Sequence, residues 1–138
     1  MRRKALLSAT ALAIAAIAIR AGATTGTPAP AESRFEAEVA PLLLTHCAIC
    51  HMTGDEAGQL SLIPDNAIAS LVGTKSAEAP GRTRVIPGDP DGSYLVMKLE
   101  GTHMAHGGAG ARMPFGGPPL PVEEIAKVRK WIAEGARP

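Results

Sequence analysis

Aromatic side chains are scarce in this sequence and make up only 3% of it. Much of the other apolar content is alanine, which buries little area, so hydrophobic stabilisation at roughly 25 cal/mol per Å² stays small. Small domains of this kind usually recruit disulfides, metals or a cofactor. The scarcity therefore predicts that a bound apolar group completes the core. The aromatic residues after the N-terminal segment are Phe35, Tyr94, Phe115 and Trp131.

Cysteine is equally rare, because Cys47 and Cys50 are the only two in the sequence. They allow at most one disulfide. A bridge across two intervening residues closes a very small loop and constrains the unfolded chain little. A disulfide framework is therefore excluded as the source of stability.

The N-terminal segment has the pattern of an export signal. Met1–Lys4 is basic, Ala5–Ile19 is uncharged and mainly apolar, and Ala21–Ala23 is an A-x-A cleavage site. The apolar run is shorter than the roughly 20 residues that a membrane-spanning helix needs. We therefore expect residues 1–23 to be a signal peptide and the mature protein to be periplasmic. The alternative is an uncleaved anchor through residues 5–19, the only arrangement in which we expect membrane contact.

The charge pattern lacks a block of either sign. The formal net charge is +1, and cleavage after Ala23 removes four basic residues and no acidic one, which leaves −3. Neither a basic tail nor an aromatic ladder is present. The mature chain therefore has no electrostatic footprint for nucleic acid.

Strand patterns are also missing, and the sequence predicts an all-α fold. Thr24 to Glu32 is a flexible Pro/Thr/Ala linker, and one domain follows over residues 33–138. Apolar residues at helical spacing predict helices from about 34 to 44, 66 to 72, 94 to 100 and 122 to 134. The glycine- and proline-rich segment 102–121 is expected to be a long loop, and such loops are generally functional or disordered.

The predicted helix ends rest on local signals. Ser33 and Glu36 form a capping box, while Pro41 predicts a kink or an early end to the first helix. Asp65 or Asn66 is expected to cap the second helix and Ser93 the third. The expected stops are Gly73, Gly101 and Gly135.

The stretch Cys47-Ala48-Ile49-Cys50-His51 matches C-x-x-C-H, the attachment pattern of c-type haem. Two thiols at this spacing can form thioethers to both vinyl groups on one edge of the porphyrin. The adjacent His51 then falls under the iron as its proximal ligand. Export agrees with this interpretation, because thioether attachment takes place outside the cytoplasm.

Three other interpretations of these thiols remain, and each lacks support in the sequence. A redox dithiol of the thioredoxin type needs a βαβ context that the chain does not offer. A zinc site would crowd His46, both cysteines and His51 into six residues, whereas structural zinc uses separated pairs. A local disulfide is the third.

A haem iron held by His51 leaves one axial position, and Met113 is the favoured ligand. It lies between Arg112 and Pro114 in glycine-rich backbone, where Pro114 favours extended geometry and glycines allow close approach to a flat ligand. Met104, His103 and His106 remain as alternatives, as does an open site. Met52 and His46 are too close to the attachment turn, and Met97 fits the core of a short helix.

With these residues, the sequence resembles the single-haem class I cytochromes c from about Phe35 to Ala136. Beside CAICH, the resemblance is carried by RMP at 112–114, VIPGDPDGSYL at 85–95, KLEG at 98–101 and WIAEGA at 131–136. It implies a small fold around one covalent haem c, with the N- and C-terminal helices packed together. Phe35, Val39 or Leu43 would then meet Val128, Trp131 and Ile132. Arg82, Arg84 and Arg112 could bind the haem carboxylates, although each fits a solvated position better.

The function expected from these observations is one-electron transfer rather than enzymatic catalysis. Cys47 and Cys50 would hold the haem, and His51 and Met113 would ligate the iron. Partners would be redox proteins, such as a dehydrogenase, an oxidase or another cytochrome. The alternative is a haem protein with an open or labile sixth site that acts on peroxide or binds gases. A non-haem dithiol module is the third possibility.

Overall fold

The computed structural model describes residues 32–138, so the predicted signal peptide 1–23 and nearly all of the linker 24–32 lie outside the described range. No strand forms within residues 32–138, where only isolated β-bridges occur. The prediction of an all-α fold is therefore confirmed. In the same range, no helix is both long and apolar enough to cross a membrane. The elements are the π-helix η1 (Phe35–Val39), α1 (Ala40–His46), α2 (Pro64–Leu71), α3 (Tyr94–Glu100), the 3₁₀ helix η2 (His103–His106) and α4 (Val122–Ala133).

The N-terminal helical segment begins with the predicted capping box. The Glu36 N–H donates to the Ser33 hydroxyl, and the Ser33 N–H donates back to the Glu36 carboxylate, each at 3.2 Å. Pro41 lies in the first turn of α1 and lacks an N–H. The preceding turn is widened into η1, where the Ala40 N–H reaches the Phe35 carbonyl. The chain therefore stays helical past the predicted end at Leu44, as far as His46.

The starts of α2 and α3 differ from the predicted caps. α2 begins at Pro64, a residue preorganised for the first helical position, so neither Asp65 nor Asn66 is its cap. Ser93 does precede α3, but its hydroxyl makes no cap bond. It donates to the Asp89 carbonyl at 2.7 Å and accepts the Ile86 N–H at 2.9 Å. Ser93 therefore closes the preceding turn.

The expected C-terminal stops hold for α3 and α4. Gly101 follows α3 in the left-handed conformation with φ 80°, which favours glycine. α4 ends at Ala133, close to the predicted Glu134. Val122, the first residue of α4, is 72% exposed, so the buried stripe of this helix begins further along it.

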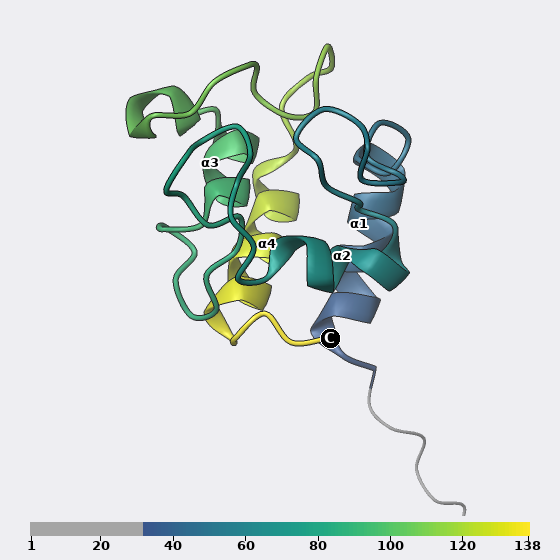
Figure 1. Ribbon diagram of the computed structural model, residues 1–138. Helices are drawn as coiled ribbons and strands as arrows, with labels where there is room; N and C mark the ends of the chain where they lie inside the picture. The colour runs from purple at the N-terminus through teal and green to yellow at the C-terminus, as the bar shows by residue number, and fades with distance from the viewer. Residues whose placement is uncertain (1–31) are drawn as a thin grey trace, which may run out of the picture.

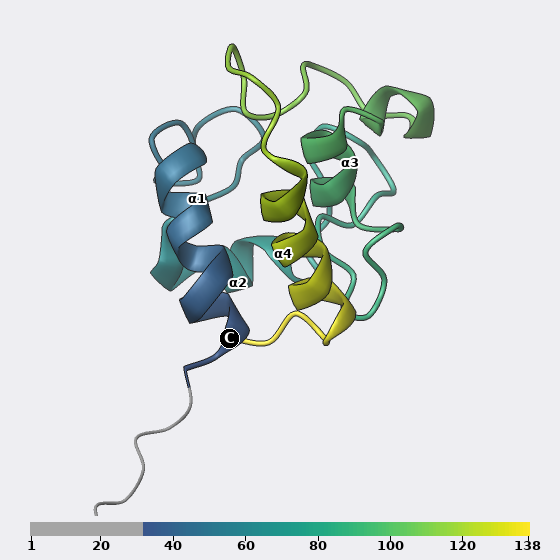
Figure 2. The same cartoon turned by 180° about the vertical axis from the view of Figure 1, so that it is seen from behind.

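The core lies where the two ends of the domain meet. α4 lies between α1 and α3 in both views, and it packs against η1 and α3 (Figures 1 and 2). The Phe35 ring lies 5.5 Å from the Trp131 ring. Val39, Leu43, Val128 and Ile132 belong to the same buried cluster. The N- and C-terminal helices thus pack together, as expected.

Candidate functional site

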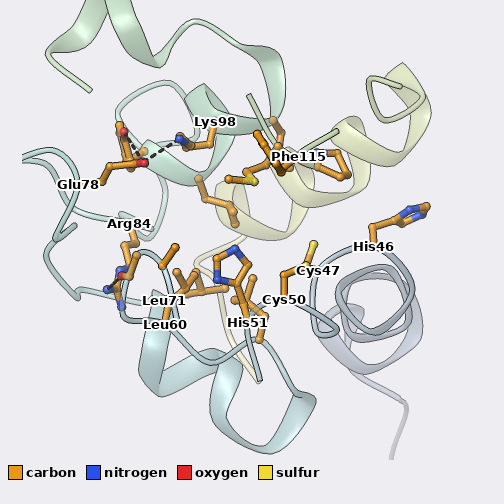
Figure 3. Close-up of a pocket in the computed structure, with 18 of the residues that line it drawn as sticks. His46, Cys47, Cys50, His51, Leu60, Leu71, Glu78, Arg84, Lys98 and Phe115 are labelled. Atoms are coloured by element: carbon orange, nitrogen blue, oxygen red, sulfur yellow. Dashed lines mark hydrogen bonds and ion pairs between the residues drawn. The ribbon is translucent and has the colours of Figure 1, made fainter. Parts of the chain in front are cut away.

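A cavity of about 470 Å³ opens beside this core. Side chains from α1, α2, α3 and the connecting segments line it (Figure 3). Its volume falls within the range of roughly 300–1,000 Å³ that is typical of small-molecule and cofactor sites. Most of the wall is apolar, including Leu60, Leu62, Leu71, Leu95 and Leu99.

The C-x-x-C-H residues form a tight turn at the end of α1 and line the cavity together. The Cys47 N–H continues the helix by donating to the Leu43 carbonyl at 2.9 Å. The N–H groups of Cys50 and His51 then both donate to the Cys47 carbonyl at 3.1 Å. Cys47 is buried, Cys50 is exposed, and no disulfide joins them. The turn therefore presents one thiol inside the cavity wall and one at its rim.

The electrostatics of Cys47 differ from those of a reactive dithiol. Burial raises the pKa of its thiol to about 11, and the neighbouring Cys50 adds to the effect. Catalytic dithiols instead need a lowered pKa, because the thiolate is the nucleophile. The buried Cys47 thus argues against the redox-dithiol interpretation.

The His51 imidazole lines the cavity. Its Nδ1 atom is buried and has no hydrogen-bond partner in the structure. Burial lowers the pKa of His51, so the ring is neutral at pH 7. Neutral imidazole is the form that ligates metals.

Met113 lines the same cavity, although it is far from the motif in sequence. Its N–H donates to the Lys98 carbonyl at 3.0 Å, which ties the segment to the end of α3. Its side chain is half-buried and packs against the main core. Phe115, two residues further on, lies across the cavity from His51 (Figure 3). The structure therefore brings all four predicted site residues to one apolar space.

The three alternative candidates for the sixth ligand, His103, Met104 and His106, do not line the cavity. Met104 is 63% exposed, His106 is exposed, and neither lines the cavity. His103 is buried, but its Nε2 atom lies 3.0 Å from the Gly110 carbonyl oxygen. Met97 packs with Tyr94 in a separate small cluster. His46 does line the cavity, and its Nε2 atom lies 3.1 Å from a Glu124 carboxylate oxygen.

The glycine-rich segment 102–121 packs closely against other protein groups. The sequence predicted instead that its glycines allow close approach to a flat ligand. A Cβ at Gly108 would lie 2.5 Å from the Tyr94 hydroxyl and 2.8 Å from the His103 carbonyl oxygen. One at Gly110 would lie 2.5 Å from a Glu78 carboxylate oxygen. These glycines therefore allow the segment to pack over Tyr94 and Glu78.

Part of the cavity wall is polar, and the sequence indicated little of it. We call Ser76, Glu78, Arg84, Tyr94 and Lys98 the polar wall. Of the three candidate arginines, Arg84 alone lines the cavity, and it is buried rather than solvated. Lys98 could have been recognised from the sequence, because it is a lysine within an apolar helical run. Glu78 lies in a loop, and no sequence pattern marks it.

Comparison with known proteins finds no matching family model, no matching curated protein and no matching solved structure. Within residues 32–138, no group of three or more His, Cys, Asp or Glu side chains is arranged to hold a metal ion. The chemistry of the site is therefore argued from its geometry. A neutral imidazole and a thioether facing one apolar space could ligate a metal inside a flat ligand, and the thiols could bond to its edge.

Proposed function

We propose that this protein is a monohaem c-type cytochrome that carries single electrons, with a fold of the class I type. One observation carries the proposal. The cavity beside the C-x-x-C-H turn is also lined by Met113, which the sequence singled out independently as the second axial ligand. The residues that could bind a haem and its iron therefore line an apolar space of the kind that a haem needs.

Each residue has a defined task in this proposal. Cys47 and Cys50 hold the haem c covalently, and the haem supplies the one-electron couple of its iron. His51 binds the iron as neutral imidazole. Met113 would be the second protein ligand of the iron, which would keep other ligands away and raise the reduction potential. The leucines of the wall keep water from the site, which also tunes the potential.

The proposed setting follows from the sequence. The mature protein is periplasmic after removal of residues 1–23, and it touches a membrane only if that segment stays uncleaved. Its partners are redox proteins that donate or accept one electron, and nucleic acid is not among them. The contact between Phe35 and Trp131 supports the class I interpretation, because the resemblance implied a packing of the two terminal helices there.

The proposed function is tested by combining electrochemistry with a ligand challenge. The exported protein is titrated through one redox cycle, and the reduced form is then mixed with carbon monoxide at neutral pH. We expect a reversible one-electron wave, low-spin spectra in both states and no rapid binding of carbon monoxide. Rapid binding would instead assign the protein to haem proteins with an open sixth site, which act on peroxide or sense gases.

A further inference from the structure

The cavity has two chemically different ends. Cys47 and His46 lie on one side of His51, while Glu78 and Arg84 lie on the other (Figure 3). Lys98 belongs to the polar wall with them. Two cations and one anion leave a formal charge of +1 there, next to an apolar space. Charge of one sign at the wall of such a site favours a ligand that carries the opposite charge at that end.

Lys98 is an ammonium group held in one position. The residue is 6% exposed, and its Nζ atom lies 2.7 Å from a Glu78 carboxylate oxygen and 3.0 Å from the Ala109 carbonyl oxygen. The same Glu78 oxygen accepts the Tyr94 O–H at 3.1 Å. An ammonium has three N–H donors, so one is left over. Lysine is almost never fully buried unless its charge is paired, and here Glu78 is the partner.

Two other residues of the polar wall, Arg84 and Ser76, also have hydrogen-bond donors that are not used within the protein. Arg84 gives one N–H to the Ser70 carbonyl at 2.8 Å and two more to the carbonyls of Gly58 and Gln59 at 2.7 and 2.8 Å. A guanidinium has five N–H donors, so two N–H groups of Arg84 remain without an acceptor. The buried Ser76 hydroxyl accepts the N–H groups of Glu78 and Ala79, which leaves its own O–H free to donate.

We propose that the polar wall binds the carboxylate edge of the ligand in this cavity, with Lys98 as the principal donor. Glu78 and Tyr94 act as positioning residues that hold the Lys98 ammonium. The identity of the ligand rests on the proposed function. In haem, the two carboxylates project from the edge opposite the vinyl groups. Attachment at Cys47 and Cys50 therefore directs those carboxylates toward Lys98 and Arg84.

The wall tolerates an anionic edge although it contains Glu78. One oxygen of that carboxylate is already bound by Lys98 and Tyr94. The other lies against Gly110. Lys98 and Arg84 can each donate a charge-assisted hydrogen bond to a ligand carboxylate, and such bonds are about twice as strong as neutral ones.

The test compares Lys98→Met with Lys127→Met in the haem-loaded protein. Lys127 is an exposed lysine of α4 that does not line the cavity. Two properties are read: the resonance Raman band of haem carboxylate bending, and the midpoint potential at fixed pH. Lys98→Met should move the band and lower the potential, because a positive charge is lost from the cavity wall and the oxidised, more positive state of the haem is then favoured. Lys98→Arg should restore both, and Lys127→Met should change neither.

Lys98→Met removes the ion-pair partner of the part-buried Glu78 carboxylate and can prevent folding. The double variant Lys98→Met/Glu78→Gln removes both charges and keeps the shape, and it should also move the band. An unmoved band in both variants would overturn the inference, even if the potential shifts, because the carboxylates would not contact Lys98. In that case covalent haem in the wild-type protein would leave the proposed function standing. A wild-type protein without covalent haem would overturn the proposed function itself.

Discussion

Met113 is the residue whose proposed role can be separated most cleanly from that of its neighbours. It lines the cavity, whereas Met104 is 63% exposed and does not. The two residues also share one segment of the chain, so their side chains can be compared in the same sequence context.

Met113→Ala should open the sixth position of the haem iron. We expect the low-spin spectrum to be lost and carbon monoxide to bind rapidly to the reduced protein, because the thioether no longer competes for the iron. The absorption spectrum with and without carbon monoxide checks this. Met104→Ala is the matched control and should behave as the wild-type protein does. A low-spin, inert Met113→Ala variant would assign the sixth ligand to another residue.

Gly108 is predicted to be required by packing. Gly108→Ala places a Cβ 2.8 Å from the His103 backbone oxygen, an atom that cannot move aside easily. We expect a loss of about 1–3 kcal/mol in the free energy of unfolding, the usual cost of overpacking. Gly117→Ala meets no atom within 4 Å and should change stability by less than about 0.5 kcal/mol. Urea denaturation measures both, and equal stabilities would contradict the packing shown here.

The site could be predicted from the sequence only where its signals are local. Cys47, Cys50 and His51 are adjacent, so their spacing alone suggests the chemistry. Met113 was chosen from its own neighbours, and the structure brings it to the cavity. The Lys98–Glu78 pair joins α3 to a distant loop, and no pattern along the chain links the two residues.

At the level of elements, sequence signals succeeded where both partners lie within one turn. The Ser33–Glu36 box forms as expected. Ser93 fails as a cap because its hydroxyl is used by the preceding turn, through Ile86 and Asp89. The exposure of Val122 has the same kind of cause. Burial depends on which neighbour packs against a helix, and helical spacing alone does not specify that neighbour.

Trp131 tests the packing of the terminal helices. Trp131→Ala removes the ring that contacts Phe35 and leaves a cavity between η1 and α4. We expect a loss of about 3–5 kcal/mol in the free energy of unfolding. Val122→Ala, at an exposed position of the same helix, should cost less than about 0.5 kcal/mol. Thermal or urea denaturation distinguishes them, and a small effect of Trp131→Ala would show that the contact contributes little.

The loop after the C-x-x-C-H turn contains an acid-sensitive carboxylate. Hydrogen bonds from backbone N–H groups, that of Thr53 first, lower the pKa of Glu56 from 4.5 to about 2. A carboxyl group whose pKa is lower in the folded state adds stability above its unfolded pKa and loses it as the pH falls. The Glu56 contribution should therefore disappear between about pH 4.5 and pH 2.

Glu56→Gln should consequently lose less stability than the wild-type protein over this acid range. The measurement is the urea midpoint of both proteins at a series of pH values from neutral to acidic. The two curves should converge at low pH, where the wild-type carboxyl group is protonated. A constant separation between them would contradict the role of the Glu56 charge.

At the scale of the whole molecule, the scarcity of aromatic residues and the cavity belong together. Phe35, Tyr94 and Trp131 are buried, while Phe115 is 77% exposed at the cavity wall. The sequence predicted that a bound apolar group supplements a thin core, and α1, α2, α3 and their connecting segments line an apolar space beside that core. The sequence could predict the need for such a group from composition, but the position of the space depends on how α1, α2 and α3 pack.

Covalent attachment of haem is tested most directly by the mass of the exported protein under denaturing conditions. Thioether bonds survive unfolding, so we expect a species that carries the mass of one haem in addition to that of the mature chain. Its two cysteines should be inert to thiol reagents after reduction. A colourless protein with the mass of the chain alone, in which Cys47 and Cys50 both react, would show that no haem is attached and would overturn the proposed function.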